Sequence, residues 1–372
     1  MRLRYFNFIG YLLLLLAAGW LVGCSYSSSF AGGGAPSNQK PTKIALLLPL
    51  QGSIGASGQA VRNGFLTAYY YAKQQQSNAP TVDVIDTSGG NVVGLYQQAV
   101  AQGADFIVGP LSKDNLQTLV GQGKLTVPTL ALNTLDNGGA IKNLYQFGLS
   151  PKDEAAQAAM QARSDGRQRA LVIYPGSAFG QGIAGAFEKS WKNHGGSIVG
   201  NYAYQSNTNL SGWVRGVMGV RRGSKVSSGR QDMDMIFLVG FPEQARQIMP
   251  LLAYYNGDKI PVYATSLVYS GNPNPQNDRD LNGIQFSDMP WILGPDTPQW
   301  SEMRAHIQSL WGNSYSRFPR LYAFGIDAYH LTYRLGSSVK GATGELSLDS
   351  DQHIRRQLQW AQIQNGVPQV LH

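Results

Sequence analysis

The chain has 372 residues, enough for about two domains, and its composition of 43% hydrophobic and 14% charged residues is typical of a globular protein. Its formal net charge is +8 at pH 7. Because the basic residues form no stripe interleaved with aromatic side chains, nucleic-acid binding is not indicated; a modest positive charge suits acidic protein or polymer partners.

The first 23 residues have the pattern of a secretory signal peptide. Arg2 and Arg4 precede nineteen uncharged residues, Tyr5–Gly23, and this run ends in small residues. The sequence "LVGC" at 21–24 resembles a bacterial lipobox, which predicts cleavage before Cys24 and acylation of that cysteine. A retained transmembrane anchor is the alternative, because about 20 apolar residues span a bilayer. The cleavage-type ending favours the signal peptide.

Lipidation of Cys24 would hold the protein on a membrane, since each buried acyl methylene contributes about 0.8 kcal/mol. Cys24 is the only cysteine, so no internal disulfide is expected. The next residue is Ser25 rather than Asp, which by resemblance to Gram-negative lipoproteins predicts an outer-membrane anchor with the protein on the periplasmic face. Residues 24–41, rich in Ser, Gly and Pro, are expected to form a flexible tether.

From Lys43 onward, short apolar runs alternate with helical patterns. Continuous runs such as "IALLLPL" at 44–50 are typical of parallel strands buried on both faces. The alternation predicts a doubly wound α/β fold. The expected strands are Lys43–Leu48, Thr81–Ile85, Asp105–Val108, Thr129–Leu132, Arg169–Tyr174, Ile198–Tyr204, Met235–Val239 and Val262–Thr265. The expected helices are Ser57–Lys73, Asn91–Gln102, Pro151–Arg163, Gly180–His194 and Pro242–Tyr255.

Two such series, one starting at Lys43 and one at Arg169, predict two Rossmann-like lobes. The stretch "YQFGLSPKDEA" at 145–155 joins a short strand to a new helix. We expect it to make the first crossing from one lobe to the other.

The loop after the first strand contains Gly52, Gly55 and Gly58. Their spacing is neither the dinucleotide G-x-G-x-x-G nor the P-loop G-x-x-x-x-G-K-[ST], so a nucleotide site is not predicted. The loop precedes a helix N-terminus, where free backbone N–H groups favour a polar or anionic ligand. A tight turn without a ligand is the other interpretation of the same spacing.

No catalytic residue, metal site or cofactor is predicted. The histidines lack metal-ligand spacing, and "YPGSAFG" at 174–180 is not the G-x-S-x-G of a nucleophile elbow. Asp327 and His330 would face each other on a helix, as a surface or capping contact rather than a catalytic pair. An enzyme acting on wall sugars would need two paired carboxylates. Only their positions near strand ends make Asp86, Asp136 and Asp153 candidates for such a pair.

A basic, Gly/Ser-rich segment spans 215–231. Its Arg221, Arg222 and Lys225 are candidate contacts for an acidic partner. A solvated loop without a partner is the alternative interpretation.

Several stretches together resemble the LppC family of lipoproteins, which has the type 1 periplasmic binding protein fold. They are "IALLLPLQG", "GADFIVGPL", "LALN", "FGLSPKDEA", "VYATS", "LNGIQFSDMP", "LYAFGIDAY" and the final 341–371. The resemblance implies a non-enzymatic regulator of peptidoglycan synthesis that binds and activates a class A penicillin-binding protein. A periplasmic receptor for an amino acid or another small molecule is the alternative. Longer family members carry an N-terminal helical-repeat domain, which is not expected between the tether and the α/β domain here.

The resemblance also implies two discontinuous lobes joined by hinge crossovers. Lobe one would comprise 42–148 plus 288–340, and lobe two 149–287 plus 341–372. The cleft between them would hold a ligand in the solute-binding relatives of this fold. The cleft-lining residues implied here are Gln51, Ser53, Ser112, Asn133, Thr134, Tyr174 and Phe179.

Overall fold

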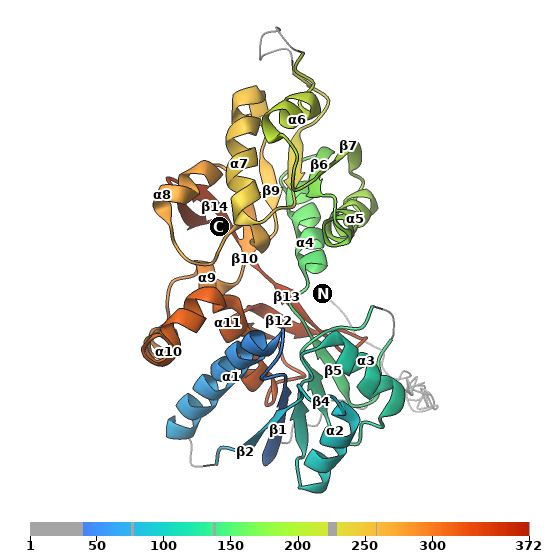
Figure 1. Cartoon of the computed structure of the whole chain (residues 1–372), viewed down its shortest axis with the longest axis vertical. Coiled ribbons are helices and arrows are strands. Elements are labelled where there is room, and N and C mark those ends of the chain that lie inside the picture. The colour runs from blue at the N-terminus through green and yellow to red at the C-terminus, as the bar shows by residue number, and fades with distance from the viewer. Residues whose placement is uncertain (1–39, 76–77, 137–138, 222–228, 258, 372) are drawn as a thin grey trace, which may run out of the picture. The chain divides into compact units, whose positions relative to one another are not determined.

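The computed structural model describes residues 40–75, 78–136, 139–221, 229–257 and 259–371 (Figure 1). The predicted signal peptide, the tether and the lipidation site at Cys24 therefore lie outside the described residues. Within the described ranges, no helix combines the length and the apolar character needed to cross a bilayer.

The first sheet has eight strands in the order β11-β12-β13-β5-β4-β3-β1-β2. Strands β1 to β5 and β13 pair in parallel, while β11, β12 and β13 pair antiparallel with one another. The strands are β1 (Lys43–Leu48), β2 (Thr81–Asp86), β3 (Phe106–Val108), β4 (Thr129–Ala131), β5 (Leu144–Phe147), β11 (Val339–Gly341), β12 (Gly344–Leu348) and β13 (His353–Gln357).

Helices cover both faces of this sheet because successive side chains of β1 point to opposite faces. Ile44 and Leu46 pack in one cluster with side chains of α1 and α11, whereas Ala45 and Leu47 pack in another with α2 and α3. The helices are α1 (Gly55–Gln75), α2 (Val92–Ala101), α3 (Lys113–Gln122), α10 (Pro298–Arg317) and α11 (Pro319–Leu331).

The second sheet has seven strands in the order β15-β14-β10-β9-β8-β6-β7. Ala170 and Val172 of β6 pack with α4 and α5, while Leu171 and Ile173 pack with α6 and α7 on the other face. The strands are β6 (Arg169–Pro175), β7 (Ser197–Tyr204), β8 (Met235–Leu238), β9 (Val262–Ala264), β10 (Gln285–Asp288), β14 (Gln359–Gln364) and β15 (Val367–Val370). The helices are α4 (Pro151–Ser164), α5 (Ala178–Asn193), α6 (Leu210–Val217) and α7 (Pro242–Leu252).

Each sheet together with the helices that pack on it is called a unit, the first or the second. Short helical segments complete the second unit and connect it to the first. A π-helical turn, η2 (Ala253–Gly257), extends α7. The others are η3 (Ser266–Val268), α8 (Pro275–Asp278), η4 (Arg279–Leu281) and α9 (Pro290–Leu293). The doubly wound α/β fold and each strand and helix expected above are thereby confirmed, with ends shifted by at most three residues.

The chain passes between the two sheets at three places. It crosses after β5, through α4; after β10, through α9, α10 and α11; and between β13 and β14, where only Leu358 separates the two strands. The expected assignment of all of 341–372 to lobe two is wrong for β12 and β13, because His353 and Ile354 pair with β5 at the edge of the first sheet. The final crossing lies at Leu358 rather than at residue 340.

Candidate functional site

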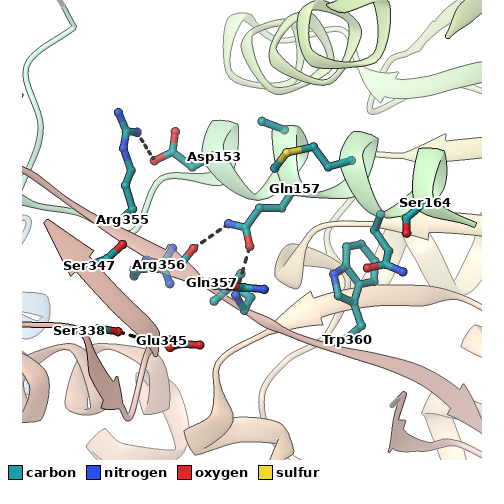
Figure 2. Close-up of a pocket in the computed structure, with 14 residues that line it drawn as sticks. Asp153, Gln157, Ser164, Ser338, Glu345, Ser347, Arg355, Arg356, Gln357 and Trp360 are labelled. Carbon is teal, nitrogen blue, oxygen red and sulfur yellow. Dashed lines mark hydrogen bonds and ion pairs between the residues drawn. The ribbon is translucent and has the colours of Figure 1, made fainter. Parts of the chain in front are cut away.

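One side chain of α4, that of Gln157, bonds the backbone of the last crossing segment at two points. The Gln157 amide donates from Nε2 to the carbonyl oxygen of Arg356 at 3.0 Å, and its Oε1 accepts from the backbone N–H of Leu358 at 3.1 Å. Figure 2 shows the amide pointing from α4 toward this strand. Gln157 therefore satisfies the backbone of the crossing as a neighbouring β-strand would.

A buried ion pair lies beside this contact. Nη2 of Arg356 lies 3.4 Å from Oε1 of Glu154, and the two side chains are only 4% and 5% exposed. Glu154 Oε2 accepts from the backbone N–H of Ser266 at 3.0 Å and from its hydroxyl at 2.8 Å. Burial raises the pKa of Glu154 above its ordinary value, and the charge of Arg356 opposes that rise.

A second ion pair continues the network through Ser266. Nε of Arg320 in α11 donates to Oδ1 of Asp288 at 2.9 Å, and its Nη2 donates to the carbonyl oxygens of Ser266 at 3.2 Å and Tyr269 at 2.9 Å. Asp288 is fully buried at the end of β10. The two pairs thus join α4, η3 and strand β10 of the second sheet to β13 and α11, which belong to or pack on the first sheet.

A groove of about 760 Å³ opens beside this network, between α4 and the strands β12 to β14 (Figure 2). One wall carries Arg355 and Asp153, whose charged groups are 3.9 Å apart, and Arg355 also pairs with Asp349 at 2.7 Å. Met160 is 43% exposed in the groove, and Trp360 packs edge-on against Tyr263. The groove therefore combines fixed charges with an apolar floor.

The predicted cleft residues Asn133 and Thr134 share a small pocket of about 180 Å³. The Asn133 amide donates to the carbonyl oxygen of Leu111 at 2.9 Å and accepts from the N–H of Thr134 at 2.9 Å. Its hydrogen-bonding groups are thus engaged by the protein itself. The rest of this pocket is lined mainly by apolar or glycine residues, Leu111, Leu132, Gly148, Leu149, Leu321 and Phe324, with Ser150.

The loop that follows β1 is hydrogen-bonded to the residues at the end of β2. Asp86 accepts from the N–H of Leu50 at 3.0 Å and from Nε2 of the predicted site residue Gln51 at 3.2 Å, while Ser88 Oγ accepts from the N–H of Gln51 at 2.9 Å. Hydrogen bonds from Ser88 and Leu50 lower the pKa of Asp86 to about 2. Ser53 is exposed in the turn that follows. The backbone N–H groups of Leu50 and Gln51 in this loop are thus bonded within the protein.

The remaining predicted cleft residues have separate local roles. Ser112 is the N-cap of α3, where its hydroxyl accepts from the N–H of Asn115 at 3.4 Å. Tyr174 is a half-buried residue of β6 that packs against the core. Phe179 is 48% exposed and stacks on Phe241, which is 47% exposed, with ring centroids 6.2 Å apart. Together these two rings form an exposed apolar patch. Of the two, only Phe179 was among the residues predicted from the sequence.

Two of the three carboxylates considered for catalysis, Asp86 and Asp136, are held by other groups. Lys113 lowers the pKa of Asp136 through a hydrogen bond and its charge, and Asp86 is held ionised by the loop. A general acid on sugars needs a raised pKa, so this chemistry has no support at either residue.

Asp327 is fully buried and accepts from the N–H of Ala342 at 2.8 Å and of Thr343 at 2.6 Å; its closest approach to Nδ1 of His330 is 4.0 Å. It anchors the β11–β12 turn to α11.

The basic segment can be described only in part. Arg221 is exposed after the end of α6, whereas Arg222 and Lys225 lie outside the described residues. Among the residues that the structure describes, no group of three or more His, Cys, Asp or Glu is placed to hold a metal ion.

The two sheets and their three crossings define a protein of the type 1 periplasmic binding protein-like class. The model of the family described as "LppC putative lipoprotein" matches residues 35–366. The chain therefore belongs to the LppC family.

Several curated relatives are named as penicillin-binding protein activators. The protein from Vibrio antiquarius named "Penicillin-binding protein activator LpoA" is 32% identical over 353 residues, covering 87% of this chain and 57% of that protein. The one of the same name from Photobacterium profundum is 29% identical and is covered to 55%. The chain thus spans little more than half the length of these curated relatives.

Two solved structures have folds similar to that of this chain. The structure titled "LpoA (YraM) C-domain from Haemophilus influenzae, a regulator of PBP1A" superposes with a TM-score of 0.72 at 29% identity, covering 89% of this chain and all of that one. A structure from Chromobacterium violaceum titled "a putative branched-chain amino acid ABC transporter" has a TM-score of 0.67 at 28% identity, covering 87% of this chain and all of that one.

Proposed function

We propose that this protein binds and activates a penicillin-binding protein and so regulates peptidoglycan synthesis without catalysing a reaction itself. The observation that supports this most is the likeness to the LpoA C-domain, which matches over its whole length and is titled a regulator of PBP1A. The partner would be a class A penicillin-binding protein. The family's description as lipoproteins supports anchoring through acylated Cys24, with the protein on the periplasmic face of the outer membrane.

The contact surface is proposed to include the basic segment with Arg221, Arg222 and Lys225. A positively charged segment would speed association with an acidic surface and lose that advantage at high salt. Charge reversal at all three residues tests this. The matched control reverses Lys124 and Lys142, which are exposed on the first unit.

The experiment measures binding of the purified full chain to a class A synthase and the rates of glycan polymerisation and crosslinking with and without it. We expect saturable binding and a rate increase that the triple reversal weakens and the control reversal leaves unchanged. Absence of binding together with unchanged rates would overturn the proposal.

A solute receptor is the second candidate, because of the likeness to the structure from Chromobacterium violaceum. Such receptors close around a ligand. Here two buried ion pairs link the crossings, and removal of one partner of such a pair is costly. Calorimetric titration with a panel of amino acids distinguishes the two: micromolar binding would favour the receptor.

A further inference from the structure

A row of polar side chains crosses the outer strands of the first sheet. Lys340, Glu345 and Gln357 are register partners on β11, β12 and β13, and all three side chains are exposed. Directly opposed residues point to the same face of a sheet. The three side chains therefore place an ammonium, a carboxylate and an amide side by side.

This polar row joins two pockets. The groove of Figure 2 lies on its α4 side, and a second pocket of about 850 Å³ lies between the row and the start of α10. Glu345, Gln357 and Leu358 line both pockets. Each has the volume of a site that holds a compact organic ligand, and together they suit a chain of several linked units.

Aromatic side chains form the walls on either side of the polar row. Trp360 lines the first pocket, and Trp300 lines the second together with Tyr71. Trp300 packs edge-on against Trp291 with ring centroids 5.8 Å apart, and the indole N–H of Trp291 donates to the hydroxyl of Tyr315 at 3.0 Å. The walls are therefore held in place before any ligand binds.

The charges of the row are balanced, while several polar groups have capacity for a ligand. Lys340 opposes Glu345, and Arg355 is paired with Asp349. Among the described residues, the Glu345 carboxylate accepts one side-chain hydrogen bond, from Ser338 at 3.4 Å. Gln359 also lines the second pocket, and its Oε1, a buried atom, finds no donor within the protein. Such a site favours a neutral ligand that donates hydrogen bonds from hydroxyl or amide groups.

Parts of the same walls offer no partner to a peptide backbone. Three prolines, Pro290, Pro295 and Pro298, line the second pocket and have no backbone N–H. On the other side, the backbone of Arg356 and Leu358 is already bonded to Gln157. Flat aromatic faces suit the C–H face of a pyranose ring, which buries apolar surface while its hydroxyls remain available.

We propose that the two joined pockets bind a neutral oligosaccharide strand carrying hydroxyl and acetamido groups, stacked between Trp360 and Trp300 and hydrogen-bonded to Glu345 and Gln357. This ligand site is separate from the basic segment proposed to contact the partner protein and does not depend on that proposal.

The test is an NMR titration of the ¹⁵N-labelled full chain with the trimer of β-1,4-linked N-acetylglucosamine, monitoring the indole N–H signals assigned to Trp300 and Trp360. We expect both signals to shift saturably. The double variant Glu345→Ala, Gln357→Ala should weaken binding about ten-fold or more, which corresponds to about 1.4 kcal/mol. The control Gln369→Ala changes an exposed strand glutamine outside both pockets and should bind like the parent chain.

Two further probes decide the ligand class. Maltotriose, which lacks acetamido groups, should bind more weakly, and a capped tetra-alanine peptide should cause no shift of either indole signal. The proposal is overturned by no shift at about 10 mM trimer, by equal affinity of the double variant with an unchanged melting temperature, or by peptide binding in place of the sugar. Equal binding of maltotriose would overturn the acetamido assignment.

Discussion

The carboxylate of Glu154 and the guanidinium of Arg356 lie 3.4 Å apart, although 202 residues separate them in the sequence. One belongs to the first helix of the second unit and the other to the last strand of the first sheet. Their pairing, extended through Ser266 to Arg320 and Asp288, ties together the segments by which the chain crosses between its sheets.

Removal of one partner of this pair is expected to destabilise the protein strongly. Arg356→Met leaves the Glu154 carboxylate buried without its countercharge, and such changes cost about 3–5 kcal/mol. The double variant Glu154→Gln, Arg356→Met should recover much of that loss, because no buried charge is left unpaired. Urea unfolding of the parent chain, both single variants and the double variant measures this; a loss under about 1 kcal/mol in Arg356→Met would show that the pair is not a structural tie.

The stability that Glu154 contributes should depend on pH in a defined direction. Because the folded-state pKa of Glu154 is raised, the folded protein holds this proton more tightly than the unfolded chain does. The contribution is complete below the unfolded pKa of about 4.3 and is lost as pH rises through the folded pKa.

Glu154→Gln removes this titration. The free energy of unfolding of the parent chain minus that of Glu154→Gln should therefore be larger at pH 5 than at pH 7.5. A difference that is constant or grows with pH contradicts the raised pKa.

Gln157→Ala is expected to lower stability by about 1–3 kcal/mol, because it leaves the Arg356 carbonyl and the Leu358 N–H of the crossing without their partners. Gln161→Ala is the matched control. Gln161 lies one turn further along α4 in the same groove and donates only to exposed Asp165, at 2.9 Å. Amide hydrogen exchange at Leu358 should accelerate in the first variant alone; equal effects of the two substitutions would exclude a specific role for Gln157.

Gly64→Ala should destabilise the packing of α1 on α11. A Cβ at Gly64 would lie 2.1 Å from the carbonyl oxygen of Tyr322, and one at Gly325 would lie 2.1 Å from that of Val61, so both helices rely on glycine for their close approach. We expect a loss of about 1–3 kcal/mol. Gly185→Ala, at an exposed helical glycine with open space around it, should instead stabilise by about 0.4–1 kcal/mol. Thermal unfolding checks both signs.

Much of the fold was predictable because its central strands are apolar runs and its helices follow them at regular intervals. The outer strands β12 and β13 were not assigned because their signal is weak: "HIRRQ" at 353–357 contains only one apolar residue, and its second buried position is Arg356. The burial of Arg356 in a strand is explained by its ion pair with Glu154. Nothing local in the sequence identifies that partner.

The site was less predictable than the fold. Gln51 was expected to face a ligand, yet its amide contacts Asp86, which lies 35 positions further along the chain. The groove beside α4 depends on the side chain of Gln157 and on a crossing at Leu358, and neither has a recognisable motif. Contacts between segments that meet only after folding determine this region, so sequence periodicity could not reveal it.

Reconstitution with a class A penicillin-binding protein and its lipid-linked substrate tests the central claim most directly. Addition of the purified full chain should raise the rate of glycan polymerisation or crosslinking in a saturable way that follows complex formation. An unchanged rate and no complex at micromolar concentrations of both proteins would contradict the account.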